Sequence, residues 1–261
     1  MTSPVVELRN VSKHFGGTDA LHDVSFAIFS GQVHCLLGDN GAGKSTLIKT
    51  ISGVHQPNAG EVFIDGELIR MKSPRDAFVR GIAAVQQSTQ GIPLMSVARN
   101  FFLGAEPVKG RGPLRRFDHK KAENLALENL RRMGLTGISS GSQPVGTLSG
   151  GERQALAISR AMYFGARVLI LDEPTSALGV KEAEFVLRLV RRARREGVAV
   201  IFITHNVQHA MAVGDAFTIL IKGEVAARFE RGEKTRDEVL SLMAGGEDFA
   251  ALVAGLDDDT L

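Results

Sequence analysis

The sequence has no tryptophan, one tyrosine and one cysteine. A single cysteine excludes an intrachain disulfide, and the apolar neighbours of Cys35 predict a buried strand residue in a reducing compartment. Its longest apolar runs, such as Val198 to Ile203, fall far short of the roughly 20 residues that cross a bilayer. The first residues have neither a basic segment nor an apolar one, so they do not predict a secretory signal. If the protein acts at a membrane, other subunits must span it.

The sequence also lacks an excess of positive or negative charge. The chain has 31 Lys and Arg against 29 Asp and Glu, a formal net charge of +2. This balance gives no global field that would favour nucleic acid. Hydrophobic residues make up 44% and charged residues 23% of the 261 positions, which excludes a disordered chain and predicts a globular protein of one to two domains.

Basic residues do cluster in two places. The first cluster lies on one expected helix and is interpreted as a solvated face rather than a nucleic-acid site; it comprises Arg188, Arg191, Arg192, Arg194 and Arg195. The second lies in an expected loop and comprises Arg111, Arg115 and Arg116. Lipid headgroups and a membrane partner are both open interpretations for that loop.

Apolar runs and helix-length stretches alternate along the chain. We expect strands at Val5 to Leu8, Val24 to Ile28, Val33 to Leu37, Glu61 to Ile64, Ile82 to Val85, Val168 to Leu171, Val198 to Ile203 and Phe217 to Ile221. We expect helices at Lys44 to Ser52, Pro74 to Arg80, His119 to Met133, Glu152 to Phe164, Lys181 to Arg195 and Gln208 to Val213. This order predicts an α/β fold with a largely parallel central sheet.

Two parts of the chain depart from that pattern. The early strands alternate and are separated by turns, which predicts a small antiparallel layer beside the main sheet. From about residue 88 to 165 the pattern predicts helices and loops without strands, as in an inserted helical lobe. We therefore expect one domain over residues 1–244 and an acidic, partly disordered C-terminal tail over residues 245–261.

A glycine-rich segment follows the third expected strand and precedes a helix. It reads Gly38, Asp39, Asn40, Gly41, Ala42, Gly43, Lys44, Ser45, Thr46 and fits the phosphate-loop pattern G-x-x-x-x-G-K-[ST] in the right context. Glycines let consecutive backbone N–H groups approach a phosphate closely. Lys44 would neutralise the β and γ oxygens, and the Ser45 hydroxyl is a candidate Mg²⁺ ligand. The segment predicts a nucleotide site.

A second apolar strand, Val168 to Leu171, ends in two carboxylates. Ligand sites of open α/β sheets form at this end of the strands. Because neighbouring side chains on a strand point in opposite directions, we expect Asp172 and Glu173 to do different jobs. We assign Asp172 to Mg²⁺ and Glu173 to polarising the attacking water as a general base.

The segment Leu148-Ser149-Gly150-Gly151-Glu152-Arg153-Gln154 resembles the signature motif of ABC-type ATPases. Its chemistry is that of a second phosphate clamp at a helix N-terminus. The nucleotide-binding set is therefore expected to include Ser149, Gly150, Gly151 and Glu152. Glu152 replaces the commoner glutamine of the family, which adds a charge near the γ-phosphate side.

The resemblance covers roughly Val5 to Glu230 and assigns three further residues. Phe15 matches the aromatic residue that stacks on adenine. Gln87 matches a glutamine that contacts Mg²⁺ and senses the membrane partner, with Gln86 as its rival. His205 matches the histidine that contacts the γ-phosphate and orients Glu173. His205 and His209 have the spacing of a zinc helix, but Asn206 replaces the required glutamate, so no zinc is assigned.

The family resemblance implies a RecA-like core, an antiparallel layer and an inserted helical lobe. It also implies a homodimer in which the phosphate loop of one subunit and the signature of the other enclose each ATP with Mg²⁺. The stretch from Asp172 to Glu182, with Gly179 where the family usually has aspartate, is similar to bacterial importers of the ribose and fructose type. Membrane permease subunits and, indirectly, a periplasmic sugar-binding protein would be the partners, at the cytoplasmic face of the inner membrane.

An alternative function is that of a soluble ABC ATPase acting on DNA or ribosomes. The DNA-repair proteins of this type separate the two phosphate motifs by long coiled coils. No sustained heptads lie between Lys44 and Ser149. The ribosomal factors join two ATPase domains in one chain, whereas each motif occurs once here. Both observations favour the transport ATPase.

Overall fold

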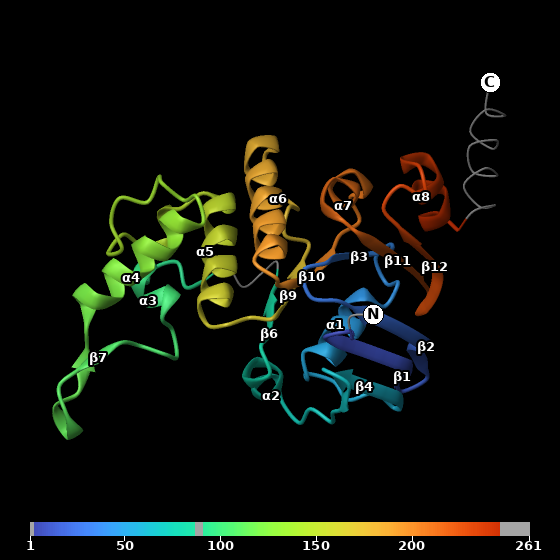
Figure 1. Cartoon of the computed structure of the whole chain (residues 1–261), viewed down its shortest axis with the longest axis horizontal. Coiled ribbons are helices and arrows are strands. Elements are labelled where there is room, and N and C mark those ends of the chain that lie inside the picture. The colour runs from blue at the N-terminus through green and yellow to red at the C-terminus, as the bar shows by residue number, and fades with distance from the viewer. Residues whose placement is uncertain (1–2, 87–90, 246–261) are drawn as a thin grey trace.

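The computed structural model describes residues 3–86 and 91–245 (Figure 1). Its main sheet has six strands in the order β12-β11-β3-β10-β9-β6, in which only β12 is antiparallel to its neighbour. The strands are β3 Val33–Leu37, β6 Ile82–Val85, β9 Val168–Asp172, β10 Ala199–Ile203, β11 Ala216–Ile221 and β12 Glu224–Glu230. The predicted parallel α/β sheet is confirmed.

A second sheet covers one side of the main sheet. Its four strands follow the order β2-β1-β4-β5 and are antiparallel. They are β1 Val6–Phe15, β2 Thr18–Ile28, β4 Ala59–Ile64 and β5 Glu67–Leu68. Arg167, just before β9, donates two hydrogen bonds to Asp65 between β4 and β5, at 2.6 and 2.8 Å. The expected antiparallel layer is confirmed.

Alternating side chains of the buried strands divide the core into two clusters. On β3, Cys35 and Leu37 enter the cluster shared with the helical lobe and with α6 to α8. Leu36, between them, enters the cluster shared with the antiparallel layer and α1. Because a strand has a side-chain period of two, the five buried residues of β3, four apolar ones and a histidine, lie on both faces of the sheet. The expected buried position of Cys35 is confirmed, and burial raises the pKa of its thiol.

The helices lie on both faces of the main sheet and in the lobe. They are α1 Lys44–Ile51, α2 Pro74–Val79, α3 Val97–Phe101, α4 His119–Arg132, α5 Gly150–Tyr163, α6 Val180–Arg195, α7 Val207–Val213 and α8 Arg236–Met243, with short 3₁₀ turns at Gly112–Leu114 and Val145–Thr147. The lobe of α3, α4 and α5 extends to one side of the sheet (Figure 1). Three rings, of Phe101, Phe102 and Tyr163, pack there with centroids 5.1 to 5.4 Å apart.

The expectation of no strands between residues 88 and 165 is wrong. A hairpin of two short strands, β7 Val108–Lys109 and β8 Arg116–Phe117, projects from the lobe. Two-residue strands carry no hydrophobic period, so the sequence pattern could not show them. No described helix is both long and apolar enough to span a bilayer.

The arginines of α6 are largely neutralised within the chain. Arg188 pairs with Glu184, Arg192 with Glu196 and Arg194 with Asp215. Arg191 donates to the carbonyl of Ala212. The sequence pattern of this cluster is interpreted as a solvated face, and the structure adds that three of its arginines pair with acids of the same chain.

Candidate functional site

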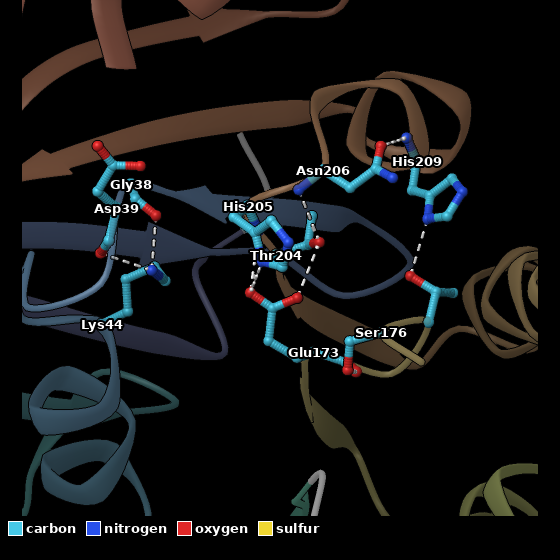
Figure 2. Close-up of polar contacts among 10 residues, drawn as sticks. Gly38, Asp39, Lys44, Glu173, Ser176, Thr204, His205, Asn206 and His209 are labelled. Carbon is cyan, nitrogen blue, oxygen red and sulfur yellow. Dashed lines mark hydrogen bonds and ion pairs between the residues drawn. The ribbon is translucent and has the colours of Figure 1, made fainter. Parts of the chain in front are cut away.

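The candidate site lies where three neighbouring strands end. The order β3-β10-β9 brings together the loop after Leu37, the carboxylates at the end of β9 and the polar residues that follow Ile203. Parallel strands present their carboxyl ends at one edge of a sheet, which is where open α/β folds bind ligands. Figure 2 shows Lys44, Glu173 and His205 along this edge.

Two glycines allow the loop after β3 to pack closely. Gly38 has φ +143°, and a Cβ there would lie 2.3 Å from the Leu220 carbonyl oxygen. Gly43 has φ +99°, and its Cβ would lie 2.6 Å from the Ala20 carbonyl oxygen. Gly43 is also the N-cap of α1 and makes no side-chain capping hydrogen bond to the helix end. The backbone therefore reaches the helix N-terminus by a path that only glycine permits.

Lys44 bends back over this loop. Its Nζ donates to the carbonyl oxygens of Gly38 at 2.6 Å and Asp39 at 2.9 Å, as Figure 2 shows. Burial lowers the pKa of Lys44, while the nearby charges of Glu173, Asp39 and Asp172 raise it. Among the described residues this largely buried ammonium is hydrogen-bonded to carbonyl oxygens, and such a group is suited to an incoming anion.

The other predicted loop residues are neighbours of Lys44 in the sequence. Asp39, Asn40, Gly41 and Ser45 are exposed, Ala42 is buried, and Thr46 is half-buried. The Ser45 hydroxyl at the start of α1 is therefore open to a ligand.

Glu173 sits in an unusual backbone conformation immediately after β9. Its φ is +48°, a left-handed value that is uncommon for residues other than glycine. Its N–H donates to the carbonyl of Ile203 at 3.0 Å, which ties this turn to the end of β10. Strained conformations of this kind persist where surrounding contacts hold them, often at functional sites.

Both carboxylate oxygens of Glu173 have donors from the neighbouring turn. Oε1 accepts the backbone N–H of His205 at 3.0 Å and lies 2.8 Å from its ring Nδ1. Oε2 accepts the Thr204 hydroxyl at 3.1 Å. The predicted pair Glu173 and His205 is thus brought together. Thr204 was missed by sequence reasoning, although it lies directly after a buried strand and beside His205.

Asp172 is the last residue of β9 and is partly buried. Its pKa is raised by burial and by the charge of Glu173, an effect that Lys44 and Lys49 oppose. The two carboxylates were expected to diverge because of strand pleating. The strand, however, ends at Asp172, so the positive φ of Glu173 sets the direction of the second side chain instead.

The signature segment begins α5. Ser149 is the N-cap: its hydroxyl accepts the Glu152 N–H at 3.3 Å, and the Glu152 carboxylate accepts the Ser149 N–H at 2.8 Å. This reciprocal pair is a capping box. The carboxylate of Glu152, the residue that departs from the family's glutamine, is therefore used at the N-cap of its own helix.

Glu182, a residue that sequence reasoning assigned no role, links α6 to the signature. One carboxylate oxygen accepts the Gly179 N–H at 3.3 Å at the start of α6, and the other accepts the Gly151 N–H at 3.4 Å. Hydrogen bonds from the Ser149 hydroxyl and from these two amides lower the pKa of Glu182. A Cβ on Gly151 would lie 3.0 Å from Glu182 Cβ. The spacing of Glu182 three residues after Gly179 was a usable capping signal.

The phosphate loop and the signature are not joined within the described part of the subunit. No hydrogen bond or ion pair there links Ser149–Glu152 to Gly38–Thr46. Figure 1 places α1 beside the sheet and α5 in the lobe. The two helix ends that the sequence predicts to bind phosphate therefore belong to separate parts of the chain.

The remaining predicted residues have different outcomes. Phe15, at the end of β1, is 45% exposed, and its ring contacts the His55 ring at 5.1 Å between centroids. Gln87 lies outside the described residues. His209, the candidate partner of His205 in a zinc pair, has its Nδ1 2.9 Å from the Thr175 hydroxyl. Within the described ranges no group of three His, Cys, Asp or Glu side chains could hold a metal ion.

Comparison with known proteins places this geometry in context. A family described as "ABC transporter" matches residues 21–176. The fructose import ATP-binding protein FrcA of Rhizobium meliloti is 37% identical over 249 residues, covering 94% of this chain and 95% of that protein. The ribose import ATP-binding protein RbsA 1 of Streptomyces coelicolor is 40% identical over 94% of this chain, which spans only 47% of that relative.

A solved structure agrees with the fold. It is a dimeric ATP-binding cassette in a post-hydrolysis state with ADP and Pi. It superposes with a TM-score of 0.71 at 27% identity, over 88% of this chain and 100% of that one.

Proposed function

The chain belongs to the ABC transporter family, and from that premise we propose that it is the ATP-hydrolysing subunit of a bacterial monosaccharide importer. The observation that carries the proposal is that Lys44 and the Glu173–His205 pair lie along the same edge of the main sheet. The same edge offers a helix N-terminus without a side-chain cap.

The loop from Gly38 to Thr46 binds the ATP phosphates. Its backbone N–H groups and the N-terminus of α1 attract the anion, and Lys44 exchanges its carbonyl contacts for phosphate oxygens. Phe15, exposed at the end of β1, supplies a face for the adenine ring.

Mg²⁺ fits the residues at this edge. Asp172 is a partly buried carboxylate whose pKa is raised by burial, and no ion pair to it occurs among the described residues. Ser45 presents an exposed hydroxyl. Together with Gln87, these oxygen donors would hold the ion, which neutralises charge on the β- and γ-phosphates when bound.

Hydrolysis depends on the Glu173 carboxylate. With Oε2 held by Thr204 and Oε1 by His205, the group is oriented before substrate arrives and takes a proton from the attacking water. The His205 ring, whose Nδ1 faces Glu173, leaves Nε2 to contact the γ-phosphate. Most of the rate enhancement then comes from positioning and electrostatics.

The signature of a second subunit completes the site. Because the phosphate loop and the signature are separate in the described chain, Ser149 to Glu152 would face the ATP of a partner in a head-to-tail homodimer. ATP closes this dimer and hydrolysis reopens it, which shifts the transporter between its states.

The permease would dock between the core and the lobe. A cavity of about 510 Å³ lies there, between α2, β6, α3 and α5. Phe78, on α2, is half exposed at its rim, and Leu103 lies on the lobe side. An apolar groove between two parts of one subunit suits an inserted helix.

We assign residues 1–244 to the ATPase domain, with the lobe at about 88–165 and the tail at 245–261.

The importer names of FrcA and RbsA 1 support a sugar as the solute. In such a system the subunit lies at the cytoplasmic face of the inner membrane, and a periplasmic sugar-binding protein delivers the substrate to the permease. Solute selection would then reside in those partners.

Co-purification tests this function. The Glu173→Gln variant is extracted from native membranes with ATP, and the proteins that accompany it are identified. A multi-spanning permease is the expected result. Ribosomes or DNA-repair proteins without a membrane subunit would leave the ATPase chemistry standing and overturn the transport function.

A further inference from the structure

The β7–β8 hairpin projects from the helical lobe. Val108 pairs with Phe117, and Lys109 pairs with Arg116. Its base is closed by the Asp118 N–H, which donates to the Pro107 carbonyl at 2.8 Å, and by the Phe117 ring, which packs against the lobe core. The hairpin is thus held firmly where it leaves the lobe.

Its charge is of one sign and is unpaired. Residues 107–117 contain four cations, Lys109, Arg111, Arg115 and Arg116, and no carboxylate. All four are exposed, and none forms an ion pair with another described residue. On α6, by contrast, three arginines pair with nearby acids.

Two of these cations repel each other in the isolated subunit. Lys109 and Arg116 lie directly opposite each other in the antiparallel ladder. Like charges in that position repel and destabilise a hairpin. A surface of anions would remove the repulsion, so the arrangement is suited to a negatively charged partner.

The hairpin also exposes apolar side chains. Leu114 is 81% exposed and Val108 is 42% exposed. The aromatic residue of the hairpin, Phe117, packs inward and is not free to stack on a base, which disfavours single-stranded nucleic acid. Basic side chains beside an exposed leucine are typical of segments that bind the membrane interface.

The hairpin points to the side of the molecule that would face the membrane. In Figure 1 it extends on the same side as α2 and away from α6, α7 and α8. The cavity proposed for the permease lies between α2 and the lobe. If that docking is correct, the hairpin reaches the lipid beside the permease.

We propose that the β7–β8 hairpin binds the anionic phospholipid headgroups of the membrane. Lys109, Arg111, Arg115 and Arg116 contact the phosphates, and Leu114 enters the interfacial layer. The side of the molecule assigned to the membrane rests on the proposed function, whereas the lipid-binding chemistry rests on the hairpin alone.

Sedimentation of the full chain with vesicles tests the proposal without a permease. Vesicles of equal parts phosphatidylglycerol and phosphatidylcholine should bind the protein at low ionic strength, and pure phosphatidylcholine should not. Since each cation near an anionic surface changes binding about fivefold, Arg111→Glu with Arg115→Glu and Arg116→Glu should weaken binding by more than about 100-fold. Leu114→Ser should weaken it about threefold or more.

A matched control reverses three cations elsewhere. Arg195→Glu, Lys234→Glu and Arg236→Glu change the net charge equally on the α6 and α8 side of the molecule, and vesicle binding should stay within about threefold. Equal losses in the two triple variants, or no loss in the hairpin variant, would overturn the proposal.

Two further measurements separate this proposal from its rivals. ATP turnover in solution should be unchanged in the hairpin variant, so a failed ATPase and a failed lipid contact are distinguishable. If the hairpin variant binds vesicles as the wild type does but associates more weakly with the permease, the hairpin binds an acidic protein surface and not lipid. That result would overturn the proposal.

Discussion

His205 holds the Glu173 carboxylate through two groups, its backbone N–H at 3.0 Å and its ring Nδ1 at 2.8 Å, both to the same Oε1. The backbone bond remains when the ring is removed, because the amide belongs to the main chain. The ring therefore helps to orient a carboxylate that the backbone already anchors. Its Nε2 points to a second role, the contact to the γ-phosphate proposed above.

Removal of the ring should slow ATP hydrolysis without preventing ATP binding. In the His205→Ala variant, kcat should fall about 10- to 100-fold, because an oriented general base and one polar contact are lost. His209→Ala is the control, since the His209 ring contacts the Thr175 hydroxyl rather than Glu173. Equal rates for His205→Ala and the wild type would remove His205 from the mechanism.

Glu173→Gln should have the larger effect. The amide retains the shape of the side chain but cannot take a proton, so turnover should fall about 10²- to 10⁴-fold while ATP affinity stays within about threefold. With ATP, light scattering should detect a stable dimer. Glu184→Gln, a carboxylate on the exposed face of α6, is the control.

The two substitutions should not be additive. Because His205 acts on the reaction partly through Glu173, the double variant should hydrolyse ATP little more slowly than Glu173→Gln alone. Fully additive losses would instead mean that the two side chains work independently.

Much of the fold could be predicted because its strands are buried apolar runs. Four residues of Val33–Leu37 enter the two core clusters, and the short length of this run together with the glycine-rich loop after it predicts a central strand. By contrast, β12 Glu224–Glu230 was missed, because Phe229 is its one buried side chain and its pairing with β11 positions it. The helix α8 was missed although Thr235 and Glu238 form a capping box.

The candidate site was predictable only where a motif fixes the spacing. The segment from Gly38 to Thr46 is contiguous, so the sequence identifies it directly. Thr204 and Glu182 act through residues about 30 positions away, Glu173 and Gly151. Contacts of that kind depend on the three-dimensional register of strands and helices, which no local pattern records.

Glu182 should oppose the entry of a phosphate at the signature. Its carboxylate already accepts the Gly151 N–H, a group that the partner's ATP would need. In the Glu173→Gln background, Glu182→Gln removes one negative charge there and should lower the ATP concentration for half-maximal dimerisation about two- to fivefold. Glu184→Gln again serves as control. A higher ATP requirement would show that Glu182 mainly holds α5 and α6 together.

Acid should destabilise the subunit partly through His34. This side chain lies on β3, 7% exposed, with its Nε2 2.9 Å from the Thr218 hydroxyl. Burial, with a smaller contribution from the charge of Arg228, lowers the pKa of His34 from 6.5 to about 3. In the unfolded chain His34 takes up a proton below about pH 6.5, whereas in the folded chain it does so only near pH 3.

The free energy of unfolding should therefore decrease as the pH falls from 6.5 towards 3, by at most about 1.4 kcal/mol per pH unit from this residue. His34→Gln retains a hydrogen-bonding group for Thr218 but does not titrate, so urea unfolding at pH 7 and pH 5 should show a smaller loss than in the wild type. His14→Gln, at an exposed position, should lose as much as the wild type. An identical acid-induced loss in His34→Gln would mean that other groups account for the loss and that His34 takes up its proton over the same pH range in the folded and the unfolded chain.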